Sequence, residues 1–74
     1  MGRPLHELVE ANVRKRAMAK KMPLDAVARG SGISMERLLA IFSGAYDPDL
    51  ELVGRIAATL GVTAADLLAE PEFN

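Results

Sequence analysis

The stretch "GISMERLLAIFSG" (residues 32–44) decides the fold that this sequence predicts, because it delimits a short helix at both ends. Ser34 is a favoured N-cap residue, and Glu36 places a carboxylate in the first turn, where the helix dipole favours negative charge. Gly44 can adopt the left-handed conformation with which many helices end. The helix between them is unusually apolar, since it carries Leu38, Leu39, Ile41 and Phe42.

The residues before this stretch predict a second short helix and a tight turn. Pro23 ends the preceding helix, because a residue before proline avoids the α region. We expect a helix from about Leu24 to Arg29, followed by a turn at Gly30-Ser31-Gly32, where two glycines permit positive φ. Two helices joined by a short turn that contains glycine form a helix-turn-helix, and the predicted motif covers about residues 24–43.

Three further helices flank this motif, and no stretch alternates apolar and polar residues as a half-buried strand does. We expect one helix from about Pro4 to Lys20 and another from the Asp49 cap to Gly61. Thr63 and Asp66 predict a capping box at the start of the last helix. Gly54 lies inside a helix at a cost of about 1 kcal/mol relative to alanine, so we expect another helix to approach closely there.

Composition predicts one all-α domain over residues 1–74, with a polar tail at 69–74. The chain has no Cys, so disulfides and cysteine-based metal sites are excluded, and half of its residues are hydrophobic. No apolar run reaches about 18 residues, which argues against a membrane span, and the N-terminus lacks a secretory pattern. We therefore expect a cytoplasmic protein.

Charge is distributed unevenly along the chain. The net charge is −1, which argues mildly against a binder of polyanions. Residues 1–37 nevertheless carry eight Lys or Arg and four Asp or Glu, whereas residues 38–74 carry one and six. A basic first half can place one positive face against phosphates, although charges on small helices also scatter unevenly by chance.

Three segments carry a resemblance to a known family: "NVRKR" (residues 12–16), "MPLDAVARGSGISMERLLAIFSG" (22–44) and "DPDLELVGRIAATLGVTAADLL" (47–68). Together they resemble the Cro/repressor-type (XRE-like) helix-turn-helix family of phage and bacterial regulators. The third segment is the most similar, with a Pro-x-Leu start and an Ile-Ala-x-x-Leu-Gly-Val end. The resemblance covers about Asn12 to Leu68 and implies a compact five-helix, lambda-repressor-like fold.

The resemblance implies a homodimer that binds double-stranded DNA and regulates transcription, with the second motif helix in the major groove and without metal or cofactor. It places base contacts at Ser34, Met35, Glu36 and Arg37. Phosphate contacts fall to basic residues in the first half of the chain: Arg14, Lys15, Arg16, Lys20, Lys21 and Arg29. Arg37 is the strongest base reader, because guanidinium can pair with guanine.

The sequence departs from the family in two places, and these departures support an alternative function. Pro23-Leu24 replaces the family's Ser-Gln, whose glutamine contacts phosphate, and Leu39-Ala40-Ile41-Phe42 replaces its Ser-Arg-Ile-Glu. The helix-turn-helix could instead be a scaffold that binds a protein such as a regulator, a toxin or a sigma factor. Its surface would be an apolar patch of Leu39, Phe42, Ala45 and Tyr46, unless Phe42 and Tyr46 fold back into the core.

Two questions remain open at the level of sequence. The dimer surface could include Leu67, Leu68 and Phe73, which could equally belong to the core or the tail. His6 is the only histidine and lies one turn before Glu10, yet a metal site needs three or four ligands. No nucleophile–base pair or phosphate-cradling glycine loop is present, so we expect no enzymatic activity.

Overall fold

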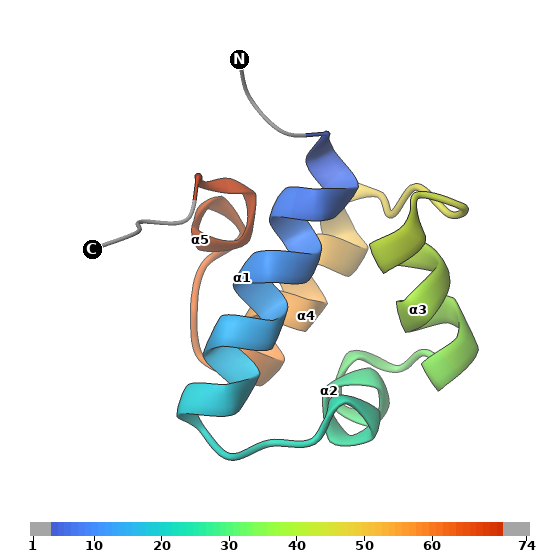
Figure 1. Ribbon diagram of the computed structural model, residues 1–74. Helices are drawn as coiled ribbons and strands as arrows, with labels where there is room; N and C mark the ends of the chain where they lie inside the picture. Colours follow the sequence, from blue (N-terminus) through green and yellow to red (C-terminus); the bar gives the residue numbers. More distant parts are fainter. Residues whose placement is uncertain (1–3, 71–74) are drawn as a thin grey trace.

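The computed structural model describes residues 4–70, which form five helices and no strand (Figure 1). In chain order they are α1 (Leu5–Ala19), α2 (Leu24–Ser31), α3 (Met35–Ser43), α4 (Leu50–Leu60) and α5 (Ala64–Leu68). The expected all-α fold is thus confirmed. Helix α1 packs between α3 and α5, and α2 packs against α4 (Figure 1). None of the helices within residues 4–70 has the length and apolar content needed to cross a membrane.

The core takes buried aliphatic side chains from every helix. Every helix has at least one residue that is completely inaccessible to solvent, among them Val13, Val27, Leu38, Ile56 and Leu67. Leu67 is therefore a core residue rather than a dimer contact, which resolves one of the alternatives left open by the sequence. A helix as short as α5 is not stable alone, so this burial helps to hold it on the rest of the molecule.

The predicted helix caps are present. The hydroxyl of Ser34 accepts the N–H of Arg37 at 3.0 Å, and the carboxylate of Asp49 accepts the N–H of Leu52 at 2.8 Å. Thr63 and Asp66 form the reciprocal capping box, in which each backbone N–H donates to the other side chain. These bonds, first of all the one from the Thr63 backbone, lower the pKa of Asp66 below its usual value.

The turn between α2 and α3 is shorter than the sequence predicts. Gly30 and Ser31 belong to α2, and Gly32 alone adopts positive φ, at 77°. The hydroxyl of Ser31 is buried and donates to the carbonyl of Val27 at 2.7 Å, within the helix. Because this bond satisfies Ser31 inside α2, the helix continues to Ser31 and the chain reverses at a single glycine.

Close helix approach occurs at Gly30, whereas the expectation for Gly54 was wrong. A Cβ atom at Gly30 would lie 2.5 Å from Cγ2 of Thr59, so only glycine lets α2 come this close to α4. A Cβ at Gly54 would meet no atom within 4 Å. Gly54 faces open space. Packing against the described residues therefore does not explain why a glycine stands at this helical position.

This contrast predicts opposite effects for two identical substitutions. Gly30→Ala should lower the free energy of unfolding by about 1–3 kcal/mol, because overpacking displaces Thr59. Gly54→Ala should raise it by about 0.5–1 kcal/mol, because alanine is the better helix former and has room. Urea denaturation measures both values. Adding Thr59→Ser to Gly30→Ala removes Cγ2 and should restore part of the loss, and equal stability of both glycine variants would contradict the packing argument.

A buried polar side chain joins α1 to the carboxyl end of α5. Asn12 is only 5% exposed, and its Nδ2 donates to the carbonyls of Leu67 at 2.8 Å and Ala69 at 2.7 Å. These are carbonyls at the end of a helix, which have no partner within the helix. One amide group therefore satisfies two orphan acceptors and fixes where α5 ends. Ala69, the first residue of the expected tail, is therefore bound to α1. Residues 71–74 of that tail, including Phe73, lie outside the described residues.

Loss of this amide should destabilise the whole fold. We expect Asn12→Ala to lower the free energy of unfolding by about 1–3 kcal/mol, because it leaves the buried carbonyl of Leu67 and the partly buried carbonyl of Ala69 without this donor. Asn12→Asp should be worse at neutral pH, since an ionised carboxylate only accepts hydrogen bonds and would face two carbonyl oxygens. Denaturation of wild type and both variants at pH 7 and at pH 4 measures these differences in the free energy of unfolding. A stability of Asn12→Ala equal to that of wild type would show that α5 does not depend on this contact.

Candidate nucleic-acid interface

Helices α2 and α3 form the predicted helix-turn-helix. After Gly32, the N–H of Ile33 donates back to the carbonyl of Ala28 at 3.0 Å, which closes the end of α2. The chain then enters α3 at the Ser34 cap. The start of α3 lies beside α2, and the other end of α3 leads into the loop that returns to α4 (Figure 1). This arrangement presents the first turn of α3 at an edge of the molecule.

The predicted base-contact residues differ in their exposure. Ser34, Glu36 and Arg37 are exposed, whereas Met35 is half-buried and packs against the core. The Ser34 oxygen already accepts the backbone N–H of Arg37, and its hydroxyl hydrogen remains a donor toward solvent. The surface of this turn therefore offers one cation, one carboxylate and one hydroxyl.

Arg37 stacks on an aromatic ring. Its guanidinium carbon lies 4.3 Å from the centroid of the Tyr46 ring, within the range of a cation–π contact. Tyr46 reaches this position because Gly44 has φ of 84° and reverses the chain, after which the N–H groups of residues 45 and 46 both donate to the carbonyl of Ala40. Tyr46 is therefore in contact with Arg37. The sequence predicts it either in a patch for a protein partner or in the core.

The predicted apolar patch loses its phenylalanine. Phe42 is only 4% exposed and belongs to the core, so of the two alternatives for this residue the structure shows the one in which it folds back. Residues 38, 41 and 42 share one face of α3, and this face packs against α1. Leu39, Ala45 and Tyr46 remain exposed, so the patch is smaller than expected and contains a tyrosine that is already in contact with Arg37.

The predicted phosphate contacts do not lie on one face. Arg14 is on the side of α1 that faces the motif, with its guanidinium 5.2 Å from the ring of Phe42. Arg16 is two positions further on, which is about 200° around a helix axis. Its charge acts on Asp66 of α5 and helps to lower the pKa of that carboxyl. Lys20 also extends away from the motif, toward Gly61.

Two of the predicted phosphate-contact residues pair with acidic residues on their own helices. Arg14 pairs with Glu10, and Arg29 pairs with Asp25, each at 2.9 Å. Both side chains of the second pair are more than half exposed, at 73% and 57%. Exposed pairs of this kind contribute about 0–1 kcal/mol, so a phosphate can displace the carboxylate at little cost. Lys15 and Lys21 are exposed.

Comparison with known proteins places the chain in a family. A family model described as "Helix-turn-helix" matches residues 13–67. The chain belongs to the XRE-like helix-turn-helix family. No curated protein sequence matches it.

Two solved structures resemble this helix-turn-helix chain along most of its length. One is titled a hypothetical transcription factor NHTF from Neisseria, with 26% identity, a TM-score of 0.83 and coverage of 92% of this chain and 78% of that one. The other is the clp gene regulator ClgR from C. glutamicum, with 27% identity, a TM-score of 0.77 and coverage of 90% and 87%. Both therefore share the arrangement of helices described above.

His6 and Glu10, the pair considered for a metal site, do not pair with each other. The ring of His6 lies against Gly44, where a Cβ atom would come within 2.9 Å of Nδ1. The Glu10 carboxylate instead accepts from Arg14. Residues 4–70 hold no group of three or more His, Asp or Glu side chains placed to bind a metal ion.

The stacking of Arg37 on Tyr46 predicts a spectroscopic signature in the free protein. The ring current of Tyr46 should shift the side-chain proton resonances of Arg37 upfield. Tyr46→Phe keeps the ring and should keep the shift, whereas Tyr46→Leu should abolish it. Side-chain NMR of the three proteins makes the comparison. Random-coil shifts for Arg37 in wild type would rule out the contact.

Proposed function

We propose that this chain is a non-enzymatic, DNA-binding transcriptional regulator that places α3 in the major groove of double-stranded DNA. The observation that carries the proposal is the first turn of α3, where Arg37 is exposed at the edge of a helix-turn-helix that matches the family model. Family members of this type read bases from the start of this helix. Arg37 would donate to guanine, and Ser34 and Glu36 would contact bases or phosphate beside it.

Phosphate contacts would come from cations around the motif. Arg14 lies beside α3, and Arg29 is exposed near the end of α2. The start of α2 adds backbone donors, because Pro23 provides no side-chain cap for its first turn. Free N–H groups at a helix start bind phosphate, and they can compensate for the glutamine that the family usually has there. Arg16 and Lys20 lie toward α5 and the α4–α5 turn, so we leave them out of this interface.

We further propose that two copies act together. One bidentate contact between arginine and guanine supplies only about 1–3 kcal/mol of discrimination. Leu39, which is 44% exposed, can add apolar contact with thymine methyl groups but no hydrogen bond. A homodimer on a palindromic site doubles these contacts, with half-sites about one helical turn apart.

A protein-binding scaffold is the second candidate function. The observation in its favour is that Leu39 and Ala45 are both exposed, together with a net charge of −1. In that case the first turn of α3 would contact a protein rather than a base pair, and the chain would bind DNA weakly or not at all.

Titration with random-sequence duplex DNA at two salt concentrations distinguishes these functions. We expect binding that weakens steeply as salt increases, because phosphate contacts release counterions. Arg14→Gln should reduce the slope of log K against log salt by about 1, the loss of one phosphate contact. Arg16→Gln removes the same charge on the other side of α1 and should leave the slope unchanged.

Two results would contradict the proposal. Absence of binding even at low salt would favour the protein-binding scaffold. Equal slopes for the Arg14 and Arg16 variants would mean that net charge, rather than the face beside α3, determines binding. Arg37→Ala should leave this nonspecific binding almost unchanged, because a base-reading side chain contributes mainly to sequence discrimination.

A further inference from the structure

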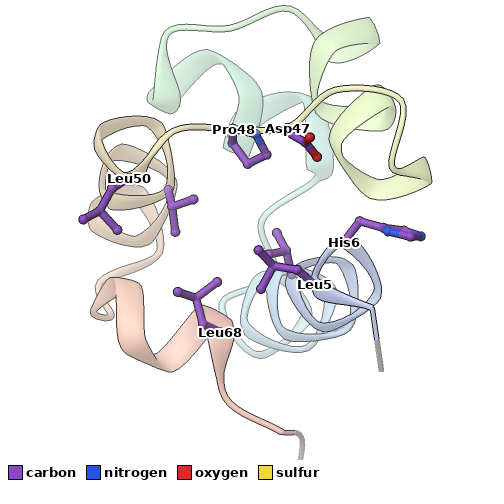
Figure 2. Close-up of a pocket in the computed structure, with 8 residues that line it drawn as sticks. Leu5, His6, Asp47, Pro48, Leu50 and Leu68 are labelled. Atoms are coloured by element: carbon purple, nitrogen blue, oxygen red, sulfur yellow. The ribbon is translucent and has the colours of Figure 1, made fainter. Parts of the chain in front are cut away.

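An apolar pocket lies outside the surface that we propose for DNA. It has a volume of about 140 Å³ and is formed by the start of α1, the α3–α4 loop, the start of α4 and the end of α5 (Figure 2). Leu5, Pro48, Leu50, Val53 and Leu68 form most of its wall, whereas His6 points away from it (Figure 2). None of its lining residues belongs to α2 or α3, so the pocket and the first turn of α3 can be occupied at the same time.

The size of the pocket suits one apolar side chain. A cavity of about 150 Å³ lined by aliphatic residues accepts a benzene ring, and the volume here is similar. Leucines on its rim face solvent, since Leu50 is 73% exposed and Leu5 is 59% exposed. Leucines in such positions contribute little to the fold, and apolar surface grouped around a hollow is typical of an interaction site.

The rim of the pocket is acidic. Asp47 forms part of the wall, and Asp49 and Glu51 flank Leu50 in the sequence. Glu7 and Glu70 are exposed near Leu5 and Leu68 along the chain. The lining residues and their immediate sequence neighbours include no lysine or arginine. Arg55 is two residues from Val53, but its guanidinium extends toward Gly32 at the end of α2. Arg3, two residues from Leu5, lies outside the described residues. An apolar hollow with this rim attracts a ligand that combines an apolar side chain with positive charge.

We propose that this pocket binds a basic amphipathic segment of another protein, whose apolar side chain fills the hollow while its Lys or Arg residues contact the acidic rim. A second copy of this chain fits less well. In a two-fold symmetric contact each patch faces its own copy, so these carboxylates would oppose their counterparts, and like charges across an interface disfavour association. The inference goes beyond the proposed DNA binding and does not rest on it.

A pair of synthetic peptides tests the recognition chemistry with the full chain. The first is a helical peptide of leucine and lysine, with leucines at three- and four-residue spacing so that they share one face. The second has the same composition in scrambled order, so that it keeps the charge but loses the apolar face. Amide shifts of the isotope-labelled protein locate and quantify binding. We expect the patterned peptide to bind tighter and to shift residues 5–9, 47–53 and 68.

Matched variants separate the apolar and the charged parts of the contact. Leu50→Gln should weaken binding of the patterned peptide about tenfold, because burying the leucine side chain under the peptide removes apolar surface from water and glutamine loses this gain. Met18→Gln changes another exposed apolar side chain, near the other end of α1, and should leave the affinity unchanged. Glu51→Lys should weaken binding severalfold, and added salt should reduce that difference. Both pocket substitutions replace exposed side chains, so we expect both proteins to fold.

Four results would overturn the inference. The first is the absence of shifts with either peptide, and the second is equal affinity of the two peptides, which would mean that charge alone drives binding. The third is a set of shifts confined to α2 and α3. The fourth is a dimer in sedimentation that Leu50→Gln dissociates, which would identify a second copy of this chain as the occupant.

Discussion

The amide of Asn12 is the contact on which the placement of α5, and with it one wall of the apolar pocket, depends. It connects α1, the helix that packs between α3 and α5, to the last carbonyls of the shortest helix. Because α5 has five residues, it has almost no stability of its own. The amide and the buried Leu67 hold it in place, and α5 in turn closes the side of the molecule that carries the apolar pocket. The pocket therefore depends on a buried polar group that binds the residues on either side of Leu68, one of its lining residues.

Features that depend on neighbouring residues were predictable from the sequence. The caps at Ser34, Asp49 and Thr63 require only a side chain and an N–H two or three residues further on, so residue type and order were sufficient. The five helices follow from the same local signals together with the spacing of apolar residues. The family was recognisable because its short motifs lie within these elements, above all in "DPDLELVGRIAATLGV" (residues 47–62).

Features that depend on distant residues were not predictable in the same way. Gly30 and Gly54 are both glycines within helices, and only the position of Thr59 shows which one permits close packing. Phe42 and Tyr46 are four residues apart, and the reversal at Gly44 sends one into the core and the other to Arg37. Likewise, the basic run in α1 looks like one cluster in the sequence, whereas helical geometry distributes it over opposite sides.

The uneven distribution of charge also gives the molecule an electric dipole. Most cations of α1 lie in its second half, toward α2, whereas Asp47, Asp49 and Glu51 lie in the α3–α4 loop and the first turn of α4. Helix α2 and this loop lie at opposite ends of α3 (Figure 1). In the field of any long polyanion such a dipole experiences a torque that turns its positive end forward. The molecule would then approach more often with its α2 end forward than with the acidic loop forward. This guidance acts only within about one Debye length, which is about 8 Å at physiological ionic strength.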